Sequence, residues 1–132
     1  MVNHLTLAVA GARKTQGIVE YCASVAHERR VLVLTYTKAN QEELIFRLKQ
    51  FAGDHHKVEV MGWFTFLLRH FVRPFLPYKF AGQHVLGFNF DGQPYFKAVG
   101  IKRFFDSNGA VYGCNLGRLA YELIGDSKGA LL

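Results

Sequence analysis

The sequence predicts an α/β fold in which a parallel sheet is flanked by helices. Apolar runs that suit buried strands alternate with segments in which apolar residues recur at helical spacing. The strand-like runs 5–10 and 31–34 are separated by one helical segment, and a strand–helix–strand unit of this length implies parallel strands with a right-handed crossover. Half of the 132 residues are apolar, so the chain can bury a sizeable core.

Composition indicates the class of partner. Sixteen Lys and Arg against ten Asp and Glu give a formal charge of +6, which favours a polyanion such as DNA, RNA or a nucleotide. Neither a membrane-spanning run nor a secretory leader is evident, so we expect a soluble, cytoplasmic protein with no membrane partner. Cys22 and Cys114 match no metal spacing, and we expect two reduced thiols.

The first strand-like run, residues 5–10, meets a small-residue turn and then the pair Lys14-Thr15. A phosphate-binding loop requires this order, because small residues expose backbone N–H groups and the following helix adds its positive end. A Lys can then reach the outer phosphates, and a Thr hydroxyl can ligate Mg²⁺. The loop is two residues shorter than the strict pattern and has Arg13 before Lys14, so an ordinary strand-to-helix turn with a solvated Lys remains an alternative.

Two helices and a strand are expected next. Apolar residues recur at helical spacing over 15–27, and the β-branched run 31–34 suits a strand buried on both faces. A second helix follows Asn40, with one apolar stripe made of Leu44, Ile45, Leu48 and Phe51. In open α/β sheets ligands bind at the carboxyl ends of strands, so Thr35, Tyr36, Thr37 and Asn40 are candidate ligand contacts. Helix capping by the threonines and packing of Tyr36 are the alternatives.

A third strand is predicted over 58–61, and a helix over 63–73 that ends at Pro74 and Pro77. Trp63 and Phe64 fit either a core or a base-stacking platform. The remainder is an insertion, with an aromatic-rich hairpin over 87–96 turning at Asp91-Gly92. A short helix over 101–105, a turn over 106–109 and a helix over 116–124 complete the prediction, the last burying Leu119, Ala120 and Leu123.

Three segments together resemble the N-terminal ATP-binding region of superfamily 1 DNA helicases of the UvrD/Rep type. Residues 10–15 are similar to the Walker A loop, and residues 34–44 with Arg47-Leu48 look like motif Ia. Residues 60–66 with Leu68-Arg69 resemble motif Ib, although Phe64 stands where the family usually has His. The likeness spans about residues 5–73 and keeps the family's order of motifs.

The resemblance implies a partial P-loop NTPase (RecA-like) core over 1–73 and an incomplete insertion over 74–132 that corresponds to the helicase 1B region. It implies that Lys14 contacts the β- and γ-phosphates of ATP and that Thr15 helps to hold Mg²⁺. The implied nucleotide contacts are Gly11, Ala12, Arg13, Lys14, Thr15 and Gln16. The implied contacts with single-stranded DNA are Thr35, Tyr36, Thr37, Asn40, Trp63, Phe64 and Thr65.

Catalytic carboxylates are missing from this pattern. ATP hydrolysis needs a carboxylate on Mg²⁺ and another that positions water, and no Asp-Glu pair occurs in the sequence. We therefore expect no catalytic residues, little hydrolysis by this chain alone, and a further partner in the remainder of a helicase chain cut before Walker B. The alternative is a non-catalytic nucleic-acid-binding protein on a degenerate P-loop scaffold, with Arg13 and Lys14 on DNA phosphates.

Overall fold

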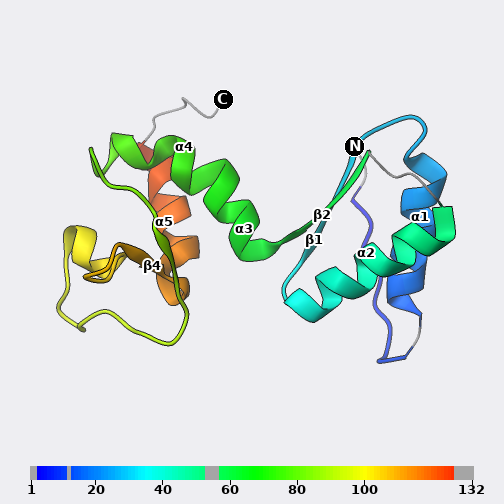
Figure 1. Ribbon diagram of the computed structural model, residues 1–132, viewed down its shortest axis with the longest axis horizontal. Helices are drawn as coiled ribbons and strands as arrows, with labels where there is room; N and C mark the ends of the chain where they lie inside the picture. Colours follow the sequence, from blue (N-terminus) through cyan, green and yellow to red (C-terminus); the bar gives the residue numbers. More distant parts are fainter. Residues whose placement is uncertain (1–2, 12, 53–56, 127–132) are drawn as a thin grey trace. The chain divides into compact units, whose positions relative to one another are not determined.

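The computed structural model describes residues 3–11, 13–52 and 57–126 and separates the chain into two compact units, 1–62 and 63–132 (Figure 1). The predicted boundary between the two parts of the chain follows Arg73. That residue begins α4 (Arg73–Phe75), within a helical run that starts at Trp63 and packs inside the second unit. The units are described separately below.

The first unit is a strand–helix–strand unit with one helix before it. β1 (Val31–Thr35) and β2 (Val58–Gly62) pair in parallel, with Val31 opposite Val58 and Thr35 opposite Gly62. α2 (Lys38–Ala52) connects them, and α1 (Lys14–Val25) packs against α2 (Figure 1). Two of the predicted strands, the predicted helix between them and their parallel direction are thereby confirmed.

The core of the first unit is small. It is formed by α1, α2 and the inward side of β1, and its buried members are Val19, Cys22, Val33, Leu44 and Leu48. Leu32 and Leu34 alternate with Val33 along β1 and are exposed, because helices cover only the side of the sheet toward which Val33 points. Burial raises the pKa of the Cys22 thiol, and both cysteines are free, as expected.

The predicted first strand, residues 5–10, is wrong. Residues 3–9 form no strand, and Leu5, Leu7 and Val9 are 84, 85 and 78% exposed. A period-two apolar pattern forms a strand only where it finds an edge to pair with and a face to bury. Within the described part of the chain, residues 3–9 have neither a partner edge nor a covered face. Among the described residues, β1 pairs with β2 alone.

The second unit is built on a helical run and α5 (Gly113–Asp126). The run passes from α3 (Trp63–Leu67) through the π-helical η1 (Leu68–Val72) and α4 to the 3₁₀ turn η2 (Leu76–Tyr78). It continues past Pro74 into α4 and η2, contrary to the predicted end. The buried core comprises Leu67, Leu68, Val72, Leu76, Phe104, Phe105, Val111, Leu116, Leu119, Ala120 and Leu123.

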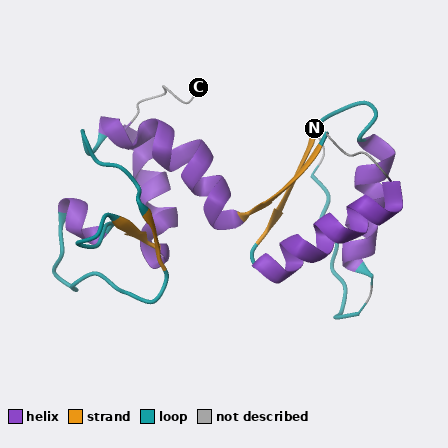
Figure 2. Ribbon diagram, viewed as in Figure 1, coloured by secondary structure: helices purple, strands orange, loops and turns teal. Residues whose placement is uncertain are grey.

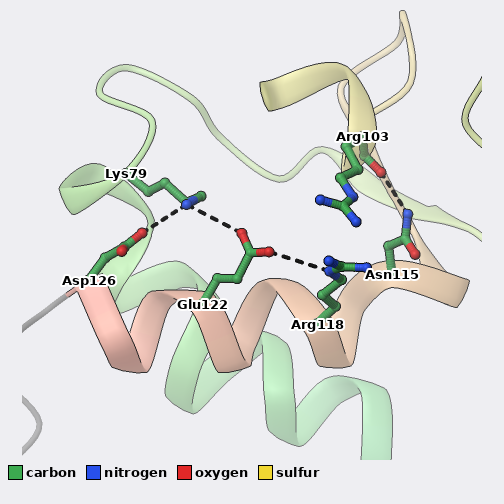
Figure 3. A network of polar contacts seen from close by, with 6 residues as sticks. All are labelled: Lys79, Arg103, Asn115, Arg118, Glu122 and Asp126. Atoms are coloured by element: carbon green, nitrogen blue, oxygen red, sulfur yellow. Dashed lines mark hydrogen bonds and ion pairs between the residues drawn. The ribbon is translucent and has the colours of Figure 1, made fainter. Parts of the chain in front are cut away.

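α5 begins three residues before the predicted helix and buries the expected Leu119, Ala120 and Leu123. Its outer side carries a polar network (Figure 3). Lys79 donates to Asp126 at 2.8 Å and lies 3.3 Å from Glu122, and Glu122 also accepts from Arg118. The hydrogen bond to Asp126 is the main cause that raises the pKa of Lys79. These ion pairs fasten the end of α5 to the segment after η2.

The predicted hairpin over 87–96 is also wrong. β3 (Gly87–Asn89) pairs in parallel with β4 (Ala110–Tyr112), and residues 93–96 form no strand (Figure 2). Asn89 explains the difference, because its Oδ1 accepts from the Gly92 N–H while its Nδ2 donates to Asp106. The turn after β3 is thus tied to a later turn, and the chain does not fold back along β3.

The turn over 106–109 is confirmed, and a 3₁₀ helix, η3 (Gly100–Arg103), stands where a short helix was predicted. Asp106 organises the turn. Its Oδ1 accepts from the N–H groups of Asn108 and Ala110, and its Oδ2 accepts from Asn89. The hydrogen bond from Asn89 is the largest cause that holds the pKa of Asp106 below its usual 3.8, followed by that from Ala110.

We expect the stabilising effect of Asp106 to disappear in acid. Because its pKa is lower in the folded protein, its contribution is complete above the unfolded pKa and is lost as the pH falls through the folded pKa, below about pH 4. Thermal unfolding of wild type and Asp106→Asn, followed by circular dichroism, should therefore differ at neutral pH and converge toward pH 2. The exposed Asp91→Asn is the matched control, and an equal pH effect there would contradict the prediction.

Candidate functional site

The candidate site lies where α1 begins. Gly11 has a φ of +81°, and Arg13, the residue before the helix, has a left-handed φ of +58°. This conformation is uncommon for a residue with a side chain, and here it turns the chain sharply into α1. Ala12 lies outside the described residues. The turn is compatible with a phosphate loop and equally with an ordinary loop-to-helix turn.

Lys14 is the first residue of α1, and its ammonium points back over the turn. Its Nζ donates to the carbonyl oxygens of Ala8 and Val9 at 2.6 and 2.7 Å. All three residues are exposed, so the ammonium remains in contact with water and with any anion that approaches. The first turn of α1 contains no acidic residue, so the positive end of the helix is not neutralised by its own side chains.

Thr15 and Gln16 follow on α1 and are half-buried. Gln16 extends toward α2, where its Oε1 accepts a long, 3.5 Å hydrogen bond from Arg47. Arg47 also pairs with Glu43 one turn earlier on α2. An open groove of about 550 Å³ lies along these helices and is lined by Gln16, Glu43, Phe46, Arg47 and Gln50.

Sequence reasoning did not identify this groove, because its members come from two helices and share no motif. Within the loop, the sequence pattern gives only Gln16, whereas Arg47 lies further along the chain, on α2. The groove joins an exposed aromatic ring, Phe46, to amide and charged groups. Such a surface can take a flat, polar-edged molecule, but no buried polar group in it selects one.

The residues after β1 have structural tasks of their own. The Thr37 hydroxyl accepts from the Asn40 N–H at 3.2 Å, which caps the start of α2, and the Thr35 hydroxyl donates to the Thr37 carbonyl at 3.3 Å. Tyr36 is 72% exposed, and Asn40 is exposed. Tyr36 and Asn40 therefore keep surface that a ligand can reach, whereas the hydroxyls of Thr35 and Thr37 are used by the turn.

Trp63, Phe64 and Thr65 open the second unit on α3. The Trp63 ring stacks on Phe66 at 5.9 Å and is 40% exposed, and Thr65 is exposed. Phe64 is half-buried and meets Phe90 edge-on at 5.1 Å, so its ring contributes to packing. Of the three, Trp63 presents the accessible aromatic surface.

Among the residues that the structure describes, no three His, Cys, Asp or Glu side chains gather closely enough to hold a metal ion. A helix long and apolar enough to cross a membrane is likewise absent from the described part of the chain. No family model, curated protein or solved structure matches this sequence. A proposal about function therefore rests on the first turn of α1 and on the exposed side chains.

Proposed function

We propose that residues 11–16 bind the phosphates of ATP together with Mg²⁺. We further propose that the chain is the ATP-binding and single-stranded-DNA-binding N-terminal part of an ATP-dependent DNA helicase of the UvrD/Rep type. One observation carries the proposal: the exposed Lys14 ammonium is held over the turn at the start of α1 by two backbone carbonyls. A phosphate would meet a cation already aimed at the loop.

For the Lys14 ammonium, replacing its two carbonyl acceptors by phosphate oxygens is chemically favourable. A neutral carbonyl is a weaker partner for an ammonium than a phosphate oxygen, because the bond to phosphate joins opposite charges. The N–H groups in the first turn of α1 have no helical acceptors and would add donors to the same anion. Arg13 supplies a second positive charge beside the turn.

In this proposal the Thr15 hydroxyl would be one ligand of Mg²⁺. Phosphate oxygens and water would supply most of the other ligands. Mg²⁺ would supply charge neutralisation between the phosphates. Tyr36 and Asn40 would contact single-stranded DNA with their exposed side chains, and Trp63 would offer a ring for stacking. The contacts with DNA would be supported by the neighbouring residues Thr35, Thr37, Phe64 and Thr65.

The second candidate is a non-catalytic nucleic-acid-binding protein in which Arg13 and Lys14 contact DNA phosphates. Its support is the same pair of exposed cations together with the absence of an Asp-Glu pair from the sequence. The two candidates differ in one measurable property. Only the first requires Mg²⁺-dependent binding of a nucleotide.

Lys14→Ala is expected to weaken binding of a fluorescent ATP analogue with Mg²⁺ by about 10- to 100-fold, the loss of one to two charge-assisted hydrogen bonds. Fluorescence titration measures it, with circular dichroism to show that the variant is folded. Lys38→Ala is the matched control, because Lys38 is an exposed lysine at the first position of α2 and should leave binding unchanged. Equal binding by wild type and Lys14→Ala would contradict the proposal.

A further inference from the structure

A loop of the second unit, residues 93–99 between β3 and η3, exposes large apolar side chains. Tyr95, Phe96 and Val99 are 66, 81 and 80% exposed, although aromatic rings are usually well covered in folded domains. In Figure 1 the loop, in yellow-green, follows a wide curve. Within the loop, the Ala98 N–H donates a hydrogen bond to the Tyr95 carbonyl at 2.8 Å. The rings are thus presented to solvent by a turn and are not packed into the core.

The two rings form a small platform with a cation beside it. The centroids of Tyr95 and Phe96 lie 4.7 Å apart with the planes tilted by 57°. The Nζ of Lys97 lies 5.4 Å from the centre of the Phe96 ring. Because the rings are tilted, each keeps a face that another flat group can cover. A flat group stacked there would have a positive charge next to it.

The loop and the turn that follows it are strongly basic. Between Asp91 and Asp106 the sequence has no Asp or Glu, and it has Lys97, Lys102 and Arg103. None of these three cations is ion-paired with a residue of the segment 57–126. Lys97 therefore lies beside the two rings, and Lys102 and Arg103 follow five and six residues later in the chain.

Arg103 has a defined setting. Asn115 of α5 donates from its Nδ2 to the Arg103 carbonyl at 2.8 Å, which fixes the end of η3 on α5. Figure 3 shows Arg103 reaching toward the face of α5 that carries Asn115 and Arg118. The carboxylate on that face, Glu122, is already bound by Lys79 and Arg118. Arg103 thus adds positive charge to a face whose acid is already neutralised.

We propose that residues 93–103, here called the aromatic-basic loop, bind a single-stranded nucleic acid. Unpaired bases stack on Tyr95 and Phe96, and the phosphates that link them contact Lys97, Lys102 and Arg103. Stacking of this kind requires bases that are free of a duplex, and it tolerates any sequence because every base has a π-face. The basic charges favour this partner over an apolar protein surface, since interface cores are depleted in Lys.

None of its residues is among those expected to contact DNA, and the proposal does not depend on the nucleotide site. Either DNA or RNA would supply the same chemistry, so the test includes both. The whole chain is titrated, without ATP, into fluorescein-labelled oligothymidylate and into oligouridylate of the same length, and anisotropy is recorded at several salt concentrations. We expect binding of at least one, with an affinity that falls as salt rises.

The decisive variant is the double substitution Tyr95→Ala with Phe96→Ala, expected to weaken oligonucleotide binding at least about 10-fold. Lys97→Ala with Lys102→Ala should reduce the slope of log affinity against log salt by about two. Tyr121→Ala is the matched control, because Tyr121 is a tyrosine of the same unit that is 77% exposed on α5, outside the loop. It should bind like wild type.

Any of the following outcomes overturns the proposal, where the double variant is Tyr95→Ala with Phe96→Ala. The wild-type chain binds neither oligonucleotide, the double variant binds as well as wild type, or Tyr121→Ala weakens binding as much as the double variant does. Loss of self-association by the double variant on size exclusion, with unchanged oligonucleotide binding, also overturns it and assigns the rings to a second copy. A chain that fails to bind ATP but passes this test contradicts the proposed nucleotide site and leaves the aromatic-basic loop supported.

Discussion

Phe104→Ala is expected to lower the free energy of unfolding by about 3–5 kcal/mol, the range for truncating a fully buried Phe. Phe104 is 1% exposed and belongs to the largest buried cluster of the second unit. Its ring lies 6.1 Å from that of Phe80, and its carbonyl accepts from the Tyr112 N–H of β4. Removing the ring leaves a cavity within this buried cluster. Urea denaturation followed by far-ultraviolet circular dichroism measures the loss.

Phe96→Ala provides the control for this prediction. It is the same chemical change eight positions earlier, but Phe96 is 81% exposed and should alter the free energy of unfolding by no more than about 0.5 kcal/mol. A loss below about 1 kcal/mol for Phe104→Ala, or similar losses for both variants, would contradict the assignment of Phe104 to the core. The same urea denaturation of the double variant Tyr95→Ala with Phe96→Ala shows whether the oligonucleotide test compares folded proteins.

The strand–helix–strand part of the fold could be predicted because local and tertiary preferences agree there. The run 31–34 is β-branched and continuous, and the stripe on the next helix points Leu44 and Leu48 toward it. The run forms a parallel strand, as predicted, but it is buried on the Val33 side only and not on both faces, because Leu32 and Leu34 are exposed. The helix that contains Leu119, Ala120 and Leu123 could be predicted for the same reason, since its apolar residues repeat at helical spacing.

The two failures share a cause. The pattern at Leu5, Leu7 and Val9 and the hairpin signal at Asp91-Gly92 describe what the segments could do locally. A strand also needs a partner edge, and that depends on residues far away in the sequence. β3 found its partner in β4, and the Asn89 side chain linked the intervening turn to Asp106, a contact that no local pattern encodes.

For the candidate site, the sequence predicted the start of a helix at Lys14 and Thr15 but not the position of the Lys14 ammonium. Where two readings were open, the structure shows that capping applies to Thr37 and packing to Phe64, without testing whether either also contacts a ligand. The predicted hairpin places Tyr95 and Phe96 in its second strand. In the structure residues 93–96 form no strand, and both rings are exposed to solvent.

Leu44→Ala is expected to destabilise the first unit by about 2–4 kcal/mol. Leu44 is 4% exposed and is one of five buried residues in the core that α1, α2 and β1 form within the described part of the chain. A core this small has few neighbouring side chains that could move into the space. Hydrogen exchange of the backbone amides of β1 and α2, recorded by mass spectrometry, should report faster exchange in the variant. Unchanged exchange there would contradict the prediction.

Leu7→Ala is the comparison variant for Leu44→Ala, and it tests whether residues 5–10 form a strand. If residues 5–10 were a strand of the sheet, as the apolar run predicts, with Leu7 on its buried face, truncation of Leu7 would cost about as much as that of Leu44. In the structure Leu7 is 85% exposed, so the expected change in the free energy of unfolding is within about 0.5 kcal/mol. A loss of 2 kcal/mol or more, on the order of a core truncation, would restore the strand. The Lys14 ammonium would then have to find partners other than the carbonyls of Ala8 and Val9.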